Sequence, residues 1–97
     1  MVITKSSWDV VHNKTQVDDI TTLVMFEHQR RVGYDTMTEY YVQLQRVLTA
    51  DESEWTDKQY EDGCDILFSD ITDDKDTALE WYLLYKRDVI EAAKDGI

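Results

Sequence analysis

The sequence predicts an all-α fold, a compact bundle of four or five helices with at most a short N-terminal strand or an extended arm. One observation is that the 97 residues include no proline, the residue that interrupts helices most strongly. The other is that three segments begin with a threonine at an N-cap position and continue with apolar residues at helical spacing. We expect residues 1–97 to form a single domain, because a chain of this length builds one hydrophobic core.

The first expected helix follows Thr15 and ends near Gly33. Thr15 has Asp18 three residues later, a spacing found at helix N-termini, and glycine is common just beyond a helix end. Apolar residues follow the cap at helical spacing, namely Val17, Ile20, Leu23 and Val24. The preceding N-terminal residues are ambiguous. Val2 and Ile3 fit a short strand, whereas a short helix or an extended arm fits Trp8, Val10 and Val11.

The second expected helix covers residues 36–48. Its first residues, Thr36 to Glu39, have the capping-box pattern, in which the two end side chains each accept a bond from the other residue's backbone N–H. The residues that follow form one apolar stripe at helical spacing: Met37, Tyr40, Tyr41, Leu44, Val47 and Leu48. Such a stripe is typical of a helix that packs one face on a core.

The third expected helix begins at Thr56, which has Gln59 three residues later, and Trp55 and Tyr60 have the spacing of a hydrophobic staple. Its expected apolar face consists of Tyr60, Cys64, Leu67, Phe68 and Ile71. A fourth helix is expected from Asp73 or Asp76 to about Asp95. Because its middle, residues 81–85, is apolar all round, it must be covered on more than one side, either inside the bundle or by another chain.

The composition excludes several classes of protein. With 21 acidic and 10 basic side chains the net charge is -11, which opposes binding to nucleic acids or to anionic membranes. The single cysteine cannot form a disulfide framework. No basic segment precedes an apolar one near the start, and no apolar run approaches the length of a membrane span. We therefore expect a cytoplasmic protein, in the host cytoplasm if a phage encodes it.

The charge is concentrated in one part of the chain. Residues 1–50 hold six acids and five bases, whereas residues 51–80 hold twelve acids and two bases. Nearly the whole negative excess therefore lies in thirty residues, and such an asymmetry is a candidate functional feature.

No motif indicates a catalytic residue, a cofactor or a metal. The two histidines, His12 and His28, lack metal-ligand spacing, and the three glycines form no phosphate-binding loop. The acidic stretch from Asp70 fails the calcium-loop template, because Lys75 stands where that loop requires glycine. Cys64 lies among apolar residues, which favours a packed thiol over a nucleophile. We therefore expect a protein that is not an enzyme.

The acidic stretch remains as the candidate binding surface. On the third expected helix Asp57, Glu61 and Asp65 follow one another at i, i+4, i+8, about 6 Å apart along one face. Like charges at this spacing oppose helix formation, and successive phosphates of a nucleic-acid strand have a comparable separation. The expected partner-binding residues are Asp51, Glu52, Glu54, Trp55, Asp57, Glu61, Asp65, Asp70, Asp73, Asp74 and Asp76.

The resulting hypothesis is a nucleic-acid mimic, an acidic protein that occupies the basic groove of a DNA- or RNA-handling protein. In size, charge and expected helix content the chain resembles the small acidic inhibitors that phages and mobile elements make against restriction, CRISPR or repair machinery. One alternative is a helical structural or regulatory module that forms a homodimer through Trp81, Leu84 and Tyr85, with incidental acidity. Another is surface acidity that serves only solubility.

Overall fold

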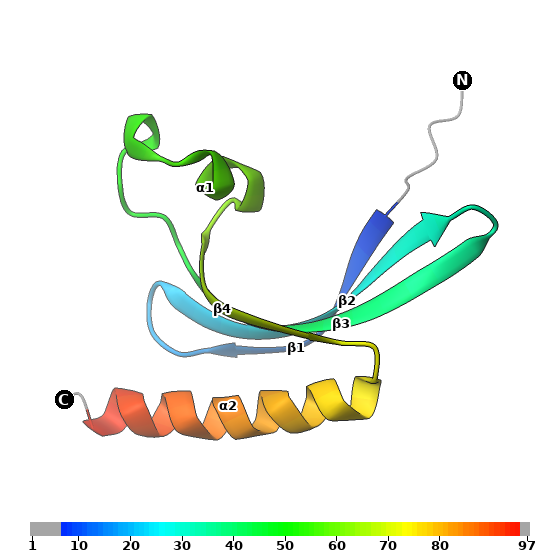
Figure 1. The fold of residues 1–97 in the computed structure, drawn as a ribbon. Helices are drawn as coiled ribbons and strands as arrows, with labels where there is room; N and C mark the ends of the chain where they lie inside the picture. The colour runs from blue at the N-terminus through cyan, green and yellow to red at the C-terminus, as the bar shows by residue number, and fades with distance from the viewer. Residues whose placement is uncertain (1–6, 96–97) are drawn as a thin grey trace.

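The computed structural model describes the backbone of residues 7–95, which forms a four-stranded antiparallel sheet with a long helix beneath it (Figure 1). The strands follow one another in the sheet in the order β1-β2-β3-β4. In chain order the elements are β1 (Ser7–Gln16), β2 (Thr21–Val32), β3 (Asp35–Arg46), η1 (Glu52–Glu54), α1 (Asp57–Asp62), β4 (Asp65–Thr72) and α2 (Lys75–Asp95).

The all-α prediction is wrong. The first expected helix runs from the end of β1 into β2, the second expected helix is β3, and the third ends at Asp62, so that its expected apolar residues Leu67, Phe68 and Ile71 lie in β4. Strands β2 and β3 both contain β-branched and aromatic residues that favour strands: two threonines, two valines and a phenylalanine in β2, and two threonines, two tyrosines and a valine in β3. In β2 the three consecutive residues Leu23, Val24 and Met25 are all buried. A strand whose successive residues are buried has a run of apolar residues, and such a run also contains the spacing of a helix. The helix bundle was therefore inferred from an apolar pattern that a helix and a buried strand satisfy equally.

The glycine expected to end the first helix lies in a hairpin turn instead. Val32 pairs with Asp35, so that Gly33 and Tyr34 alone connect β2 to β3. Gly33 has a φ of 65°, and no residue other than glycine has a positive φ in the described chain. This combination fits a type II′ turn, which takes glycine at its first central position. The expected capping box of Thr36 to Glu39 accordingly lies in β3.

The prediction of a helix from Asp73 or Asp76 to about Asp95 is confirmed by α2. Its inner face packs on one face of the sheet, where Ala78 and Tyr82 join Leu23, Met25 and Val42 in the buried core. Two polar contacts attach the helix to the sheet edges. The hydroxyls of Tyr82 and Thr15 on β1 share a hydrogen bond, and Tyr85 Oη donates to Asp70 Oδ2 on β4 at 2.5 Å.

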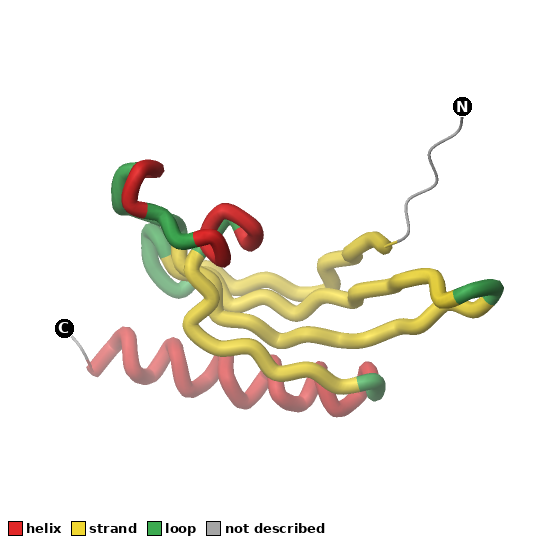
Figure 2. Tube along the Cα trace, turned by 45° about the horizontal axis from the view of Figure 1, so that its top comes forward, coloured by secondary structure: helices red, strands yellow, loops and turns green. Residues whose placement is uncertain are grey.

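The opposite face of the sheet has no comparable cover. Side chains alternate between the faces of a strand, so Val24 and Phe26 lie on this open face, whereas Leu23 and Met25 face α2. The segment with η1 and α1 lies beyond one end of the sheet on this side (Figures 1 and 2). In residues 7–95 no helix combines the length and the apolar character that crossing a membrane requires.

The alternatives for the N-terminal residues are decided in part. Trp8, Val10 and Val11 lie in β1, so the short-helix alternative is wrong for them. Val2 and Ile3 lie outside the described residues.

Replacing Leu23 by alanine should lower the free energy of unfolding by about 2–5 kcal/mol, because the side chain is 0% exposed and its loss leaves a cavity. The matched control is Leu83→Ala on the outer side of α2, where the side chain is 55% exposed and the expected change is within about 0.5 kcal/mol. Urea unfolding followed by circular dichroism measures both values. Equal losses would contradict the assignment of the core to the interface between β2 and α2.

Candidate functional site

The first of the acidic residues expected to bind a partner lie in a small folded segment. We call this segment, residues 51–62, the acidic lobe. Thr56 caps α1 through a complete capping box: its Oγ1 accepts from the Gln59 backbone at 3.2 Å, and its own N–H donates to Gln59 Oε1 at 2.8 Å. Gly63 ends α1 in the left-handed conformation, with φ 72°. The capping box predicted at Thr56 is confirmed, although the helix is only six residues long.

An aromatic pair connects the two parts of the lobe. The rings of Trp55 and Tyr60 lie 5.1 Å apart, which confirms their predicted contact. Trp55 Nε1 donates to the carbonyl of Ala50 at 3.0 Å, and Tyr60 Oη donates to the carbonyl of Glu52 at 2.7 Å. The Tyr60 bond joins α1 to η1, and the Trp55 bond ties the end of η1 to the residue before the lobe, so the lobe presents its charges on an ordered backbone.

The lobe is strongly negative, and few basic side chains neutralise its charge. It holds six acids and one base, and that base, Lys58, pairs with Asp62 at 3.4 Å. The other five carboxylates are exposed and make neither an ion pair nor a side-chain hydrogen bond with any described residue: Asp51, Glu52, Glu54, Asp57 and Glu61. Their charges are therefore available to a partner.

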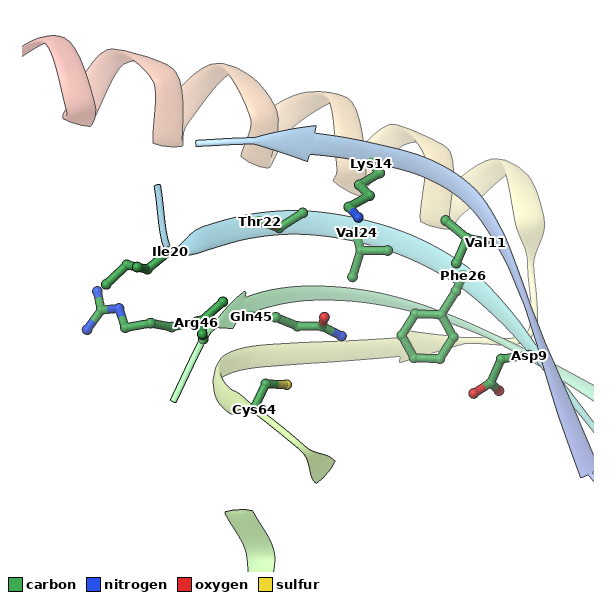
Figure 3. A pocket seen from close by; sticks show the side chains of 11 residues that line it. Asp9, Val11, Lys14, Ile20, Thr22, Val24, Phe26, Gln45, Arg46 and Cys64 are labelled. Atoms are coloured by element: carbon green, nitrogen blue, oxygen red, sulfur yellow. The ribbon is translucent and has the colours of Figure 1, made fainter. Parts of the chain in front are cut away.

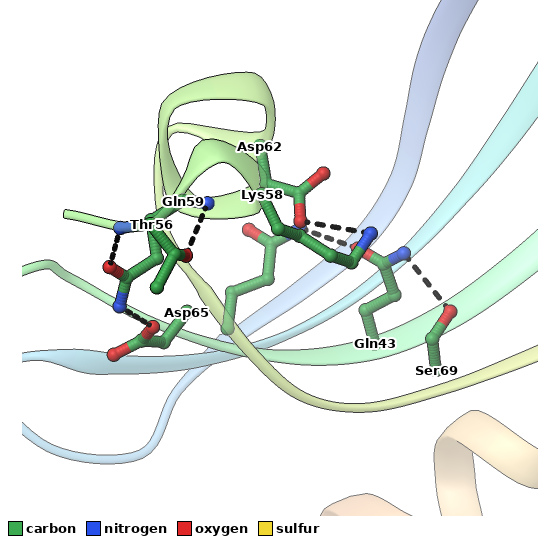
Figure 4. A network of polar contacts seen from close by, with 8 residues as sticks. Gln43, Thr56, Lys58, Gln59, Asp62, Asp65 and Ser69 are labelled. Atoms are coloured by element: carbon green, nitrogen blue, oxygen red, sulfur yellow. Dashed lines mark hydrogen bonds and ion pairs between the residues drawn. The ribbon is translucent and has the colours of Figure 1, made fainter.

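The expected row of three carboxylates on one helix does not form. Asp57 and Glu61 share α1, but the helix ends at Asp62, and Asp65 is the first residue of β4. Asp65 is half-buried, and its Oδ1 accepts from Gln59 Nε2 at 2.6 Å (Figure 4). Only two members of the row thus remain on one exposed helical surface, and the third stabilises the junction with β4.

Two of the remaining expected site residues have roles inside the fold. Asp70 faces α2 and accepts the hydrogen bond from Tyr85. Asp74 precedes α2 and accepts from Thr77 Oγ1 at 2.6 Å and from the Asp76 backbone at 3.3 Å. The bond from Thr77, together with the backbone N–H groups of residues 76 and 77, holds the pKa of Asp74 below its ordinary value. Asp74 is the N-cap of α2.

The acidic stretch is therefore divided in space. The lobe precedes β4 and the start of α2 follows it, so the eight residues of β4 separate them by about 25 Å at the usual rise of a strand. They also lie toward opposite faces of the sheet (Figure 1). The structure brings together the expected site residues of the lobe, Trp55 included, but it places Asp73, Asp74 and Asp76 elsewhere.

The sequence analysis missed a concave pocket of about 310 Å³ on the open face of the sheet. Its apolar wall includes Val24 and Phe26, and Lys14 and Arg46 also line it (Figure 3). The alternation of these side chains with Leu23 and Met25 is a strand signal, which the helical interpretation of the same residues concealed.

The described residues give little support to a metal site or to a cysteine nucleophile. No group of three or more His, Cys, Asp or Glu side chains in the described part of the chain is arranged to hold a metal ion. His12 bonds Glu27, and His28 bonds Asp9. Cys64 is half-buried, and burial, followed by the charges of Asp62 and Asp65, raises the pKa of its thiol. A raised pKa disfavours the nucleophilic thiolate.

The residues expected to form a homodimer mostly face the sheet. Trp81 and Tyr85 pack against the core, and Tyr85 also stacks edge-on against Phe68. Leu84 alone of the three is substantially exposed, at 42%.

Comparison of the chain with protein families, with curated proteins and with solved structures finds no match.

The bonds around Asp74 predict a contribution to stability that is lost in acid. Because its pKa is lowered by folding, the carboxylate stabilises the protein above its unfolded pKa, near 3.8, and this stabilisation is lost as the pH falls through the lower folded value. Asn is an equally good N-cap that does not titrate. The stability difference between wild type and Asp74→Asn should therefore shrink as the pH falls below about 4.

The matched control for this experiment is Asp73→Asn, since Asp73 is exposed and makes no bond with a described side chain. Thermal unfolding across the acidic range measures both variants. A pH dependence that changes equally in the two variants would contradict a capping role for Asp74.

Proposed function

We propose that the protein is a non-catalytic acidic binding protein whose acidic lobe occupies a cationic groove of a DNA- or RNA-handling protein, such as a restriction, CRISPR or repair nuclease or a transcription factor. The observation that carries the proposal is that five exposed carboxylates of the lobe have no partner among the described residues. Lysine and arginine side chains of a groove gain charge-assisted bonds there without breaking bonds inside the lobe.

The geometry of the lobe supports a partner with spaced positive charges. Asp57 and Glu61 are one helical turn apart, about 6 Å along the axis, which is close to two charge steps of one nucleic-acid strand at ~3.4 Å per step along the duplex axis. Tyr60 is 52% exposed beside them and offers apolar contact area. Since Trp55 and Tyr60 already order the lobe, binding loses less conformational entropy than it would in a flexible tail.

The distribution of ion pairs argues against acidity that serves solubility alone. Solubility requires net charge but no particular arrangement, and mixed charges of both signs provide it. In the lobe, by contrast, unpaired acids are concentrated on one ordered segment.

The alternative of a homo-oligomer is supported by a different observation. The outer side of α2 carries Leu79, Leu83 and Leu84, which are 39%, 55% and 42% exposed. An interface on this side would keep Leu84 of the three residues expected from the sequence, because Trp81 and Tyr85 pack on the core. A monomer in sedimentation equilibrium would exclude it.

Neutralising two carboxylates of the lobe should weaken the binding of its partner. In the variant Asp57→Asn with Glu61→Gln, affinity for a captured partner should fall at least about tenfold, because each charge-assisted bond contributes about 1.5–3 kcal/mol. The control variant, Asp73→Asn with Asp76→Asn, removes the same charge at the far end of β4 and should bind as wild type does. The measurement is capture from a lysate of the native host, followed by titration with the captured protein.

Competition with a nucleic acid distinguishes a nucleic-acid mimic from an acidic protein that binds elsewhere on its partner. Excess duplex DNA or single-stranded RNA should displace the captured protein, and capture should weaken as salt rises. The proposal is lost if the captured protein resists both nucleic acids, or if the lobe variant retains it.

A further inference from the structure

We propose that two copies of the chain join through their first strands, β1 to β1 in antiparallel register, so that two four-stranded sheets form one sheet of eight strands. Among the described strands β1 pairs only with β2, and the other side of this ten-residue strand has no strand partner there. The outward N–H and C=O groups of such an edge are a template for a further strand. This interface leaves the acidic lobe exposed and does not depend on its proposed role.

A β-bulge at His12 determines which residues of β1 share a face of the sheet. The register with β2 passes from Val11 opposite Phe26 directly to Asn13 opposite Met25, which leaves His12 as the extra residue. Side chains otherwise alternate between the two faces. A residue before the bulge and one after it therefore lie on the same face when their numbers differ by an odd number.

Asp9 and Lys14 are such a pair, five residues apart across the bulge. Both side chains line the pocket on the open face of the sheet (Figure 3). On the other face, Thr15 shares a hydrogen bond with Tyr82 of α2. Without the bulge, Asp9 and Lys14 would lie on opposite faces, so the bulge places one negative and one positive charge on the same side of the edge strand.

These two charges fix the register between the copies. Residues opposite one another in adjacent strands lie on the same face. A two-fold axis normal to the sheet satisfies this condition when Asp9 of each copy lies opposite Lys14 of the other. The same register sets Val10 opposite Asn13, both on the α2 face, whereas a shift by one residue mixes the faces. Because the contact is isologous, the ion pair forms twice.

The side chains of this edge are available for the contact. Lys14 makes no ion pair with a described residue. The Asp9 side chain is 57% exposed, and its Oδ1 alone is engaged, by His28 Nδ1 at 2.6 Å. Val10 and Val11, at the middle of the edge, are 44% and 60% exposed. A paired strand removes part of this apolar surface from water, which favours association.

Charge distinguishes the β1 edge from the other edge of the sheet. Strand β4 contains two acids and no base, and residues 59–74 hold no base at all. In an antiparallel pair of β4 edges, the lobe of each copy would lie beside the acidic start of α2 in the other copy. Strand β1 instead contains one acid and one base, so two copies of it are complementary.

The net charge of -11 does not prevent association at β1. Residues 1–50, which include β1, β2 and β3, hold six acids and five bases and are nearly neutral. In the eight-stranded sheet the two β4 strands lie at the outer edges, seven strand steps or about 34 Å apart at about 4.8 Å per step. Salt screens charges over about 8 Å at physiological ionic strength. The acidic parts of the two copies therefore repel one another only weakly.

Association and its location are measured on the full chain. Sedimentation equilibrium across the micromolar range should show a monomer in equilibrium with a dimer. In hydrogen–deuterium exchange followed by NMR, amides of β1 should gain protection as the protein concentration rises, and amides of β4 should not. A monomer at every concentration, or protection that rises outside β1, would overturn the proposal.

Exchanging the two charges tests the register. Asp9→Lys and Lys14→Asp should each raise the dimer Kd at least about tenfold, because each places like charges opposite one another at both contacts. A mixture of the two single variants restores opposite charges at both contacts, so it should associate as wild type does. The chain that carries both substitutions should also dimerise. Circular dichroism checks that each variant is folded.

The control is Arg87→Asp, which changes the net charge as Lys14→Asp does. Arg87 lies one helical turn after Leu83 on the outer side of α2, and its side chain is 64% exposed. This variant should dimerise as wild type does. A mixture that associates no better than the single variants, or a dimer that Arg87→Asp dissociates, would contradict pairing through β1. Lys14→Asp leaves the lobe intact, so loss of the dimer and loss of partner capture are separate results.

Discussion

The packing of one long helix against one face of the sheet is the contact on which the rest of the structure depends. Ala78 and Tyr82 of α2 close the core over Leu23, Met25 and Val42, and few other described side chains are fully buried. An antiparallel sheet needs only one covered face to be stable. Because α2 covers that face, much of the opposite face is open although Val24 and Gln43 are buried there, and the pocket and the lobe both lie on that side.

The same arrangement gives different roles to residues of one acidic stretch. Where α2 begins or packs, acids serve the fold: Asp74 caps the helix and Asp70 accepts the bond from Tyr85. In the lobe, the carboxylates of Asp57 and Glu61 form no ion pair or side-chain hydrogen bond within the described chain. The lobe is ordered by Trp55 and Tyr60, so its charges keep a fixed arrangement without help from the core. The acidic stretch is continuous in the sequence, but in the structure some of its carboxylates stabilise the fold and others are exposed without a partner among the described residues.

Local signals were sufficient for the start of α1 and for α2. The capping box at Thr56, the contact of Trp55 with Tyr60, and the extent of α2 all depend on residues within about one helical turn of each other. The strands depend on partners farther away, such as Tyr41 of β3, which pairs with Phe26 on one side and with Ile71 on the other. Strand preference is set by such neighbours more than by the residue itself.

The sequence by itself determined the negative charge, its concentration in residues 51–80, the cap of α1 and the helix α2. Only the tertiary structure decided that residues 21–46 form a hairpin, that the acids divide between the two ends of β4, and that side chains of β1, β2 and β3 line a pocket on the open face. The reason is physical: these features arise from hydrogen bonds and contacts between strands that are distant in the chain, and no local spacing records which strands will pair.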